Sequence, residues 1–428
     1  MIIVDEALAR REKEGRLVRF GMVGAGYMGR GIALQVLKYV KGMRVSAISN
    51  RTLDAAERAY NQAGVDAKRI NSVNELESAV SRGQHVVTDD PFLLCQAPRI
   101  DAIVEVTGTI EFGAKVVLEA IKNNKHVILM NAELDATLGP ILKVYADRAG
   151  IIITNSDGDQ PGVIMNLYRY VKAIGFKPVL AGNIKGLQDP YRTPETQRAY
   201  AERYHLKPTM ATSFADGTKI SMEMAVVANA TGFRVGRRGM YGYTCSHVRD
   251  SINLYPLDQL LNGGLVDYLL GAEPAAGVFI LGYNEHPMQR HYMNYYKMGE
   301  GPLYVFYTPY HLCHLEVPLT VARAVLFKDA AVTPLAGPVC DVVALAKRDL
   351  KAGETLDGIG GFTCYGVLEN SEVSQKENLL PMGLTEGCYL KVDVPKDRAI
   401  AYDDIELPKS RLSDKLRSEQ NKYFAARK

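Results

Sequence analysis

A glycine-rich turn directly follows the first apolar run of the sequence. Gly24, Gly26 and Gly29 are spaced as G-x-G-x-x-G, after the apolar residues 18–23 and before an amphipathic stretch. The first glycine of such a turn allows a sharp reversal, the second lets the backbone approach a phosphate, and the third permits close helix–strand packing. The helix that follows supplies N–H donors and a positive dipole end. We therefore predict a dinucleotide pyrophosphate site at Gly24, Ala25, Gly26, Tyr27, Met28 and Gly29.

The next apolar run ends in residues that distinguish two nucleotides. Ser49, Asn50 and Arg51 lie about 20 residues beyond the turn, where an NAD enzyme places an acidic residue against the ribose 2′-hydroxyl. No acidic residue occurs there before Asp54. A guanidinium binds phosphate through two parallel hydrogen bonds, so Arg51 could hold the 2′-phosphate of NADP. We expect NADP(H) rather than NAD; the alternative for Arg51 is a solvated surface charge.

Two later strand ends carry further candidates for the cofactor pocket. Thr107 and Gly108 follow the apolar run 100–106, and Asn131 and Glu133 follow the run 126–130. Ligands of an open α/β sheet bind outside the carboxyl ends of its strands. We therefore expect Thr107 and Gly108 beneath the nicotinamide ribose and Asn131 at the floor of the nicotinamide pocket. Glu133 is a candidate catalytic carboxylate beside it.

Acid–base chemistry is suggested at two places. Lys219 and Glu223 stand four residues apart in a stretch with helical spacing, so they share one helix face. Together they could polarise a carbonyl and move a proton; a surface ion pair is the alternative. Asp159, with Asp157, follows the last predicted strand of the first domain. A divalent ion such as Mg²⁺ or Mn²⁺ could bind carboxylates there, but Asp and Gly are also ordinary turn residues, so the metal ligands stay unassigned.

Four basic residues of the middle of the chain are candidate ligands of a phosphorylated substrate: Lys185, Arg192, Arg237 and Arg238. A doubly charged phosphate needs cationic partners, and the alternative for each residue is a solvated charge. His311, His314 and Glu316 also lie close together in the sequence. Their spacing of three and then two residues fits neither one helix face nor a zinc site, so we expect structural histidines.

These residues need a sheet that presents them at one edge. From residue 17 to 154, apolar runs alternate with helix-like stretches, and most runs lack the strict alternation of half-exposed strands. The predicted strands are 17–23, 43–48, 85–88, 100–106, 126–130 and 151–154, and the predicted helices are 27–40, 53–62, 111–123 and 136–148. This order predicts an α/β fold: a Rossmann doubly wound parallel sheet in an NADP-binding domain of residues 1–157.

The rest of the chain predicts two further domains. Residues 158–330 are rich in glycine, proline and tyrosine, with helical signals at 218–230, 257–270 and 318–326, the last leading back to the first domain. We expect an α+β domain for catalysis, substrate binding and oligomerisation. Residues 331–428 show short strand-like pieces at 339–346, 361–368 and 389–394, and a charged helix at 414–427. Because this small β-rich domain lacks a phosphate loop and a clustered nucleophile and base, we expect it to support assembly or cover the cleft.

Composition narrows the classes of function. The 428 residues carry a net charge of +3, with 47% hydrophobic and 23% charged residues, so nothing suggests a nucleic-acid partner. The six cysteines form no C-x-x-C pair, which favours reduced thiols and a cytoplasmic location. The sequence shows no signal peptide and no run of about 18 apolar residues. We expect a homo-oligomer that binds small molecules and no membrane.

Several of these motifs carry a family resemblance. Residues 17–157 resemble homoserine dehydrogenase and its relatives through the glycine turn, the segment 105–108, and the residues 126–127 that lead to Asn131. Residues 346–356 resemble a SAF domain, a small β fold. Taken over its whole length, the chain is similar to the DXR-like proteins, which convert 1-deoxy-D-xylulose 5-phosphate to 2-C-methyl-D-erythritol 4-phosphate with NADPH.

The resemblance implies a reductoisomerase of isoprenoid precursor biosynthesis. A divalent ion or Lys219 would polarise the C2 ketone, a base such as Glu223 or Asp159 would deprotonate, and the rearranged aldehyde would take hydride from NADPH. Homoserine oxidation is disfavoured, because the lysine that follows Asn131 in the homoserine enzymes is Ala132 here. Their helical Asp–Lys pair also corresponds to Lys219 and Glu223 with the charges reversed.

Two alternatives remain open on the sequence alone. One is a homoserine-dehydrogenase-like NADP dehydrogenase for another small hydroxy acid, polyol or sugar phosphate. The other is a non-catalytic sensor that binds NADPH. Turnover of NADPH separates the sensor from the enzymes, and product identification separates simple reduction from isomerisation followed by reduction.

Overall fold

The structure, a computed structural model, describes residues 2–427. These residues form two compact units, and we treat each by itself. Unit 1 contains the residues up to Asp159, together with Leu312–Thr333 and Lys415–Gln420. Unit 2 contains Gln160–His311, Pro334–Asp414 and the residues from Asn421 on. Each unit therefore combines stretches that are far apart in the sequence.

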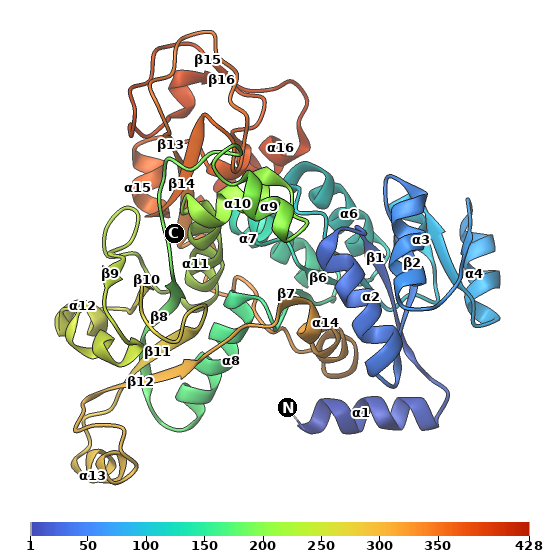
Figure 1. The fold of residues 1–428 in the computed structure, drawn as a ribbon, viewed down its shortest axis with the longest axis horizontal. Coiled ribbons are helices and arrows are strands. Elements are labelled where there is room, and N and C mark those ends of the chain that lie inside the picture. Colours follow the sequence, from blue (N-terminus) through green and yellow to red (C-terminus); the bar gives the residue numbers. More distant parts are fainter. Residues whose placement is uncertain (1, 428) are drawn as a thin grey trace. The chain divides into compact units, whose positions relative to one another are not determined.

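Unit 1 is built on a seven-stranded sheet whose neighbouring strands are all parallel (Figure 1). The order is β3-β4-β2-β1-β5-β6-β7, so the sheet winds in opposite directions from β1, as the predicted Rossmann fold requires. The strands are β1 (Val18–Val23), β2 (Met43–Ser49), β3 (Ala67–Arg69), β4 (His85–Thr88), β5 (Ala102–Glu105), β6 (His126–Leu129) and β7 (Ile153–Asn155). The predicted fold class is confirmed.

Helices of unit 1 cover both faces of this sheet. They are α1 (Ile2–Lys13), α2 (Tyr27–Tyr39), α3 (Leu53–Gln62), α4 (Val73–Ser81), α5 (Pro91–Gln96), α6 (Ile110–Lys122), α7 (Ala132–Arg148) and α14 (Cys313–Ala322), which continues as the π-helical turn η2 (Arg323–Phe327). The predicted helices agree with α2, α3, α6 and α7. The sequence pattern did not predict α1, β3, α4 and α5, most of which are short.

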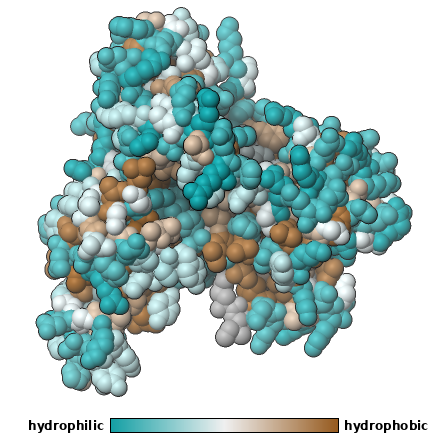
Figure 2. Space-filling model, viewed as in Figure 1, coloured by the Kyte–Doolittle hydropathy of each residue, from teal (hydrophilic) through white to brown (hydrophobic). Residues whose placement is uncertain are grey.

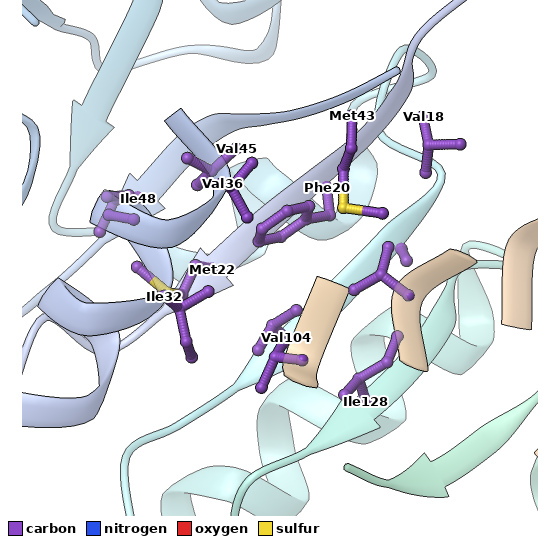
Figure 3. Close-up of a cluster of buried hydrophobic side chains, with 14 of the residues drawn as sticks. Val18, Phe20, Met22, Ile32, Val36, Met43, Val45, Ile48, Val104 and Ile128 are labelled. Carbon is purple, nitrogen blue, oxygen red and sulfur yellow. The ribbon is translucent and has the colours of Figure 1, made fainter. Parts of the chain in front are cut away.

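Burial on both faces explains why the strands have apolar runs instead of alternating patterns. Every residue of β4, β5 and β6 is buried. On one face, Phe20 and Met22 of β1 pack with Ile32 of α2 and Val104 of β5 (Figure 3). This apolar core fixes the carboxyl ends of the central strands, where the candidate cofactor residues lie.

The first helix of the chain is held against unit 1 at a glycine. Val4 and Leu8 of α1 are buried in the core of the sheet domain. The Gly42 N–H, just before β2, donates to the Glu12 carboxylate at 2.7 Å. A Cβ added to Gly42 would lie 2.0 Å from the Leu8 carbonyl oxygen. The docking of α1 therefore requires a residue without a side chain at this position.

The predicted return of the chain to the first domain is also observed. Helix α14 packs against α2 so closely that a Cβ on Gly31 would lie 2.6 Å from the His314 ring. Beyond it, the Val332 carbonyl accepts from the Asn155 N–H at 3.0 Å, at the end of β7. Residues 312–333 thus stabilise the edge of unit 1 that carries β7.

Unit 2 contains a mixed five-stranded sheet of order β12-β11-β8-β10-β9. Strand β8 is parallel to β10 and antiparallel to β11. The strands are β8 (Lys177–Lys185), β9 (Tyr243–Thr244), β10 (Leu265–Leu270), β11 (Val278–Tyr283) and β12 (Leu303–Thr308). The helices of this part are α8 (Gln160–Ala173), α9 (Arg198–Arg203), α10 (Pro208–Ala215), α11 (Thr218–Thr231), η1 (Val248–Asn253), α12 (Leu257–Leu261) and α13 (Pro287–Tyr295).

The single helix predicted over 257–270 is wrong in its second half. Helix α12 ends at Leu261, and Gly263 and Gly264 follow with φ of +96° and +85°, which a helix does not accommodate. Residues Leu265–Leu270 then form β10, and all but the last are buried. An apolar run covered on both faces has the same sequence appearance in a strand as in a buried helix.

The C-terminal region, by which we mean residues 334–414, completes unit 2. Its elements are β13 (Cys340–Ala346), β14 (Cys364–Asn370), α15 (Ser371–Lys376), η3 (Met382–Leu384), β15 (Tyr389–Leu390), η4 (Tyr402–Asp404) and β16 (Ile405–Glu406), and α16 (Leu412–Ala425) follows. Strands β13 and β14 pair antiparallel and pack against α11. The region is rich in short strands, as predicted, whereas its resemblance to a SAF domain stays a prediction.

One face of the protein shows how hydrophilic and apolar residues are distributed on its surface. On the face shown in Figure 2, the surfaces over α3 and α4 of unit 1 and over β15 and β16 of unit 2 are mainly hydrophilic, and the apolar residues lie in small groups elsewhere on this face. Scattered exposed apolar residues are ordinary for a protein surface. Within residues 2–427, no helix is both long and apolar enough to cross a membrane.

The docking of α1 can be tested with two glycines of similar backbone conformation. Gly42 has φ of +70° and Gly15 has φ of +64°, but a Cβ on Gly15 would meet nothing within 4 Å. Gly15→Ala should cost only the left-handed strain, about 1–2 kcal/mol. Gly42→Ala adds a clash with the α1 backbone, so it should lower the melting temperature further and speed amide hydrogen exchange in residues 2–13. Equal effects of the two substitutions would contradict this account.

Candidate functional site

The glycine turn of unit 1 has the shape that a dinucleotide pyrophosphate requires. Gly24 has φ of +112°, and a Cβ there would lie 2.9 Å from the Val106 carbonyl oxygen. A Cβ on Gly29 would lie 2.4 Å from the Gly24 carbonyl oxygen, so α2 and the turn can touch only through glycine. Gly26 faces open space and is the N-cap of α2, where no side chain caps the helix. The first N–H groups of α2 are therefore available to an anionic ligand.

Asn50 ties this turn to the loop that follows β2. Its Oδ1 accepts from the Ala25 N–H at 3.1 Å, and its Nδ2 donates to the Thr52 carbonyl at 3.0 Å. Ser49 is buried, and its carbonyl accepts from the Gly24 N–H at 2.8 Å. Asn50 and Ser49 thus hold the glycine turn in shape. Their contact with the nucleotide stays a prediction.

The loop after β2 carries an exposed cation. Arg51 is exposed immediately after Asn50. Two carboxylates of the following helix α3 pair with another arginine: Arg69 Nη2 lies 2.7 Å from Asp54 Oδ1, and Arg69 Nε lies 2.6 Å from Glu57 Oε1. The hydrogen bond from Arg69 lowers the pKa of Glu57. An exposed guanidinium at the position of Arg51 suits a phosphate ligand.

The ends of β5 and β6 are joined by a buried carboxylate. Glu105 accepts from the Thr107 N–H at 2.9 Å and from Asn131 Nδ2 at 2.7 Å. Burial raises the pKa of Glu105, and the hydrogen bonds from Thr107 and Asn131 oppose that shift. Asn131 also donates to the Thr109 carbonyl at 2.9 Å and caps α7 by accepting from the Leu134 N–H at 3.1 Å. The Asn131 amide thus joins the ends of β5 and β6 to the start of α7, and Gly108, after β5, has φ of +66°.

The predicted carboxylates of unit 1 occupy different surroundings. Glu133 is buried in the first turn of α7. Asp159 lies at the end of the unit and is also buried. Its neighbour Asp157 pairs with the buried Arg323 and accepts from Thr320 Oγ1 at 2.9 Å. The Asp157 carboxylate is therefore part of an internal ion pair, an arrangement that stabilises the return of residues 312–333 to the sheet.

The histidines have the contacts of structural residues. His314 packs on Gly31 of α2, and burial lowers the pKa of its imidazole. In unit 2, His311 Nδ1 lies 2.8 Å from the Ala276 carbonyl oxygen. Within residues 2–427, no group of three or more His, Cys, Asp or Glu side chains is arranged to hold a metal ion. The expectation of a divalent ion at Asp159 stays a prediction.

Unit 2 holds a buried polar cluster contributed by three elements. Lys185 Nζ of β8 lies 3.4 Å from Glu223 Oε2 of α11, and the two side chains are 19% and 2% exposed. Asn183 Nδ2 donates to the same oxygen at 3.1 Å. Gln160, the first residue of α8, donates to the two Glu223 oxygens at 2.5 and 2.7 Å and accepts from Lys185 Nζ at 2.9 Å, in the amide orientation that its neighbours require.

Regular backbone geometry brings these side chains together. Asn183 and Lys185 are two residues apart on β8, so they share one face of the strand. Glu223 lies in the middle of α11, where every residue from Ile220 to Ala230 is buried. A carboxylate in such surroundings is tolerated only with hydrogen bonds and a counter-charge. Gln160, Asn183 and Lys185 provide both.

The Glu223 carboxylate and the Lys185 ammonium differ in their exposure and therefore in the chemistry that each can perform. The Glu223 side chain is covered by protein, whereas the Lys185 side chain is 19% exposed and its ammonium donates to both Glu223 and Gln160. These two contacts use two of the three N–H groups of the ammonium. The ammonium can stabilise an oxyanion, or give and take a proton within a site that excludes most water.

The sequence identified part of this cluster. Glu223 was predicted as a catalytic group, and Lys185 as a phosphate ligand. Lys219 lies one turn before Glu223 on α11 and is half-buried, so the shared helix face is as predicted. Gln160 and Asn183 were missed. The spacing of Asn183 and Lys185 would have suggested a common strand face, but no strand was predicted there.

The other predicted phosphate ligands are engaged elsewhere in unit 2. Arg192 Nε lies 3.0 Å from Asp189 Oδ2. Arg238 pairs with Glu369 and Glu377 of the C-terminal region, at 2.7 and 2.6 Å. Arg237 donates to the carbonyls of Met240 and Tyr241, at 2.9 and 3.0 Å. None of these contacts involves the Lys185–Glu223 cluster, and the role of the three arginines in substrate binding stays a prediction.

Two known families match successive regions of the chain. One region contains the glycine turn, and the other contains the Lys185–Glu223 cluster. Residues 24–153 match the NAD-binding domain of homoserine dehydrogenase. Residues 158–317 match the family described as oxidoreductase DRL, catalytic domain. The first match contains the glycine turn, Asn50 and Asn131. The second contains Gln160, Asn183, Lys185 and Glu223.

Individual homoserine dehydrogenases are similar to parts of this chain. Homoserine dehydrogenase of Neisseria gonorrhoeae is 25% identical over 203 residues, 46% of this chain and 43% of that protein. The enzyme of Pseudomonas aeruginosa is 30% identical over 136 residues, 32% of this chain and 28% of that protein. The chain thus spans less than half the length of these relatives. The crystal structure of a homoserine dehydrogenase from Thiobacillus denitrificans aligns over 90% of this chain and 97% of that one, with 14% identity and a TM-score of 0.45.

Together, these matches show which kinds of domain the two regions of the chain resemble. The amino-terminal match is to an NAD-binding domain, and the glycine turn inside it has the geometry that a dinucleotide pyrophosphate requires. The second match, to a catalytic domain, covers the region that contains the Lys185–Glu223 cluster. The chain thus contains a region similar to the NAD-binding domain of homoserine dehydrogenase, followed by a region similar to an oxidoreductase catalytic domain.

The choice of nucleotide can be measured directly. Because Arg51 is exposed directly after Asn50 and can form charge-assisted hydrogen bonds to a 2′-phosphate, NADPH should bind at least about 10-fold more tightly than NADH, or about 1.4 kcal/mol. Arg51→Ala should remove most of this preference in a fluorescence titration. Arg58→Ala, an exposed arginine on α3, is the matched control and should leave the preference unchanged. Equal affinities of the wild type for both nucleotides would overturn the assignment to NADP.

Proposed function

We propose that this protein is an NADPH-dependent oxidoreductase in which Lys185 is the acid–base group and Glu223 is its buried counter-ion. The observation that carries the proposal is the Lys185–Glu223–Gln160 network inside the region similar to an oxidoreductase catalytic domain. The dinucleotide, when bound at the glycine turn, supplies or accepts a hydride. The protein must then supply or accept a proton at the oxygen of the same carbon.

In the direction of reduction, the Lys185 ammonium donates a proton to the carbonyl oxygen as the carbon becomes an alcohol carbon. In the reverse direction, neutral Lys185 accepts the hydroxyl proton. Glu223 stabilises the ammonium in both directions, and Gln160 and Asn183 hold the carboxylate in place. This division of roles is consistent with the exposure of the two side chains, since only Lys185 is accessible from outside the cluster.

The substrate class is a small hydroxy acid, polyol or sugar phosphate, or the corresponding carbonyl compound. Two observations support a substrate other than homoserine. Ala132 stands where the homoserine enzymes have a lysine, and Lys185 instead comes from a strand of the catalytic region. A partly exposed ammonium also suits an anionic substrate. We propose a cytoplasmic enzyme that acts as a homo-oligomer.

A reductoisomerase acting on 1-deoxy-D-xylulose 5-phosphate is the second candidate. It is favoured by the match of residues 158–317 to the DRL oxidoreductase family, which is distinct from homoserine dehydrogenase. In such a reaction, Lys185 would polarise the ketone and Glu223 would keep it charged. A divalent ion at Asp159 belongs to this candidate, and chelation by EDTA tests it.

If Lys185 and Glu223 act as proposed, substitutions of these residues should lower kcat without weakening the binding of NADPH. Lys185→Met should lower kcat by about 100-fold or more, because the proton donor is lost, and Glu223→Gln should lower it because the ammonium loses its counter-charge. Both variants should bind NADPH normally. Lys172→Met, which alters an exposed lysine of α8, is the control and should retain full turnover. Normal turnover of Lys185→Met would eliminate it as the acid–base group.

Product identification separates the two candidates. Purified protein is incubated with NADPH, Mg²⁺ and 1-deoxy-D-xylulose 5-phosphate, and in parallel with a panel of small keto acids and keto sugars. Appearance of 2-C-methyl-D-erythritol 4-phosphate establishes the reductoisomerase. Oxidation of NADPH by panel compounds, with an unrearranged alcohol as product, establishes the simple dehydrogenase. NADPH binding without any turnover would argue for a sensor and against both proposals.

A further inference from the structure

The C-terminal region sends one side chain into the interior of unit 2. Lys347, the first residue after β13, is 4% exposed. Its Nζ donates to Asp216 Oδ2 at 2.9 Å, to the Arg192 carbonyl at 2.8 Å and to the Gly361 carbonyl at 2.9 Å. All three ammonium protons are thus used, and the Asp216 side chain is fully buried. An ammonium ion is seldom buried unless its charge is offset in this manner.

Asp216 places this ion pair at the start of the helix that carries Glu223. Its second oxygen accepts from the Thr218 N–H at 2.9 Å, which satisfies a donor in the first turn of α11. Gly217, between them, has φ of +90° and is the N-cap of the helix. Burial raises the pKa of Asp216, and Lys347 opposes that shift. Without Lys347, the start of α11 would contain a buried carboxylate that lacks its cation.

Further bonds attach the same helix to the C-terminal region along its length. Thr218 Oγ1 accepts from the Gly366 N–H at 2.8 Å, and Ser221 Oγ donates to the Gly366 carbonyl at 3.2 Å. Near the other end, Asn229 Oδ1 accepts from the N–H groups of Val339 and Cys340, at 2.8 and 3.0 Å. The position of α11 is therefore determined by β13 and β14 as well as by the five-stranded sheet of unit 2.

The bond from Lys347 to the Arg192 carbonyl concerns Lys185, the other member of the acid–base pair. Strand β8 ends at Lys185, and the chain then passes through the segment that contains the Arg192 carbonyl. One ammonium group therefore joins the segment after β8 to the first turn of α11. These are the two segments adjoining Lys185 and Glu223.

We infer that Lys347 is a positioning residue for the Lys185–Glu223 pair. It acts through Asp216 and the start of α11, so that the C-terminal region is a working part of the catalytic unit. This inference rests on the proposed function for its catalytic meaning, but its structural content is independent of any substrate. It differs from the expectation that the region only covers the cleft or supports assembly.

A chemical probe of Lys185 tests the inference without a substrate. The full-length protein is treated with sulfo-N-hydroxysuccinimide acetate, and the acetylation rate of each lysine is followed by mass spectrometry. In the wild type, Lys185 should react slowly because it is held by Glu223 and Gln160. Lys347→Met should speed acetylation of Lys185 at least about 3-fold and increase hydrogen exchange in residues 218–231. Acetylation of Lys172 serves as the internal reference.

Two further variants distinguish positioning from general damage. In Lys347→Met/Asp216→Asn, the unpaired carboxylate is removed while the bond to Thr218 can be kept, so Lys185 should regain most of its protection. Lys351→Met is the matched control: Lys351 pairs with Asp393 at 2.8 Å in the same region but is 72% exposed, and its loss should leave Lys185 unchanged. If Lys347→Met is folded and Lys185 reacts at the wild-type rate, the inference is overturned. If Lys347→Met is too unstable to purify, failure of the double variant to restore the protection overturns it.

Steady-state kinetics connects the result to catalysis. With NADPH and a carbonyl substrate that the wild type reduces, Lys347→Met should lower kcat about 10-fold while the affinity for NADPH stays the same. In the Lys185→Met background, the same substitution should produce little additional loss, since the pair on which it acts is already broken. Full activity of Lys185→Met would refute the proposed function while leaving the acetylation result intact. Multiplicative losses would instead show that Lys347 acts on something other than the pair.

Discussion

The buried carboxylate of Glu223 is the constraint on which the architecture of unit 2 depends. A charge in the middle of a helix that is covered on all sides costs several kcal/mol unless partners replace the lost water. Its partners come from the start of α8 and from one face of β8. Satisfying one side chain therefore requires that a strand and two helices meet at fixed positions. The same requirement gives the site its chemical asymmetry, with the acid inside and the ammonium at the edge.

Unit 1 illustrates a different principle, because its site is made mostly by the backbone. Two glycines allow contacts that any side chain would prevent, and a third leaves space beside the start of α2. The polar side chains of this site mainly hold the backbone in shape: Asn50 fixes the turn, and Glu105 joins Thr107 to Asn131. A rigid cradle of this kind needs little rearrangement when an anionic ligand arrives.

The sequence was informative wherever local pattern determines structure. Periodicity found the sheet of unit 1 to within a few residues at most strands, because strands buried on both faces have a recognisable composition. It failed at residues 265–270, since a buried strand and a buried helix present the same apolar run. Glycine spacing likewise identified the turn, whereas short elements such as β3 carried too little pattern to detect.

The candidate acid–base site was only half visible for a similar reason. Glu223 and Lys219 are neighbours along a helix, so spacing alone relates them. Lys185 and Gln160 reach Glu223 from 38 and 63 residues away in the sequence, through a strand and a helix start that no local pattern connects to α11. The same is true of Lys347 and Asp216, which are 131 residues apart. Contacts of this kind are created by the tertiary fold.

The double role of Asn50 has a consequence for the exchange of one coenzyme for another. Its amide accepts a hydrogen bond from the phosphate-binding turn and donates to the loop that precedes α3. An aspartate at this position, as NAD enzymes use, could still accept from Ala25 but could no longer donate to Thr52. The loop would lose an attachment at the same time as it gained a negative charge. A single Asn50→Asp substitution would therefore alter the shape of the loop and its electrostatics together.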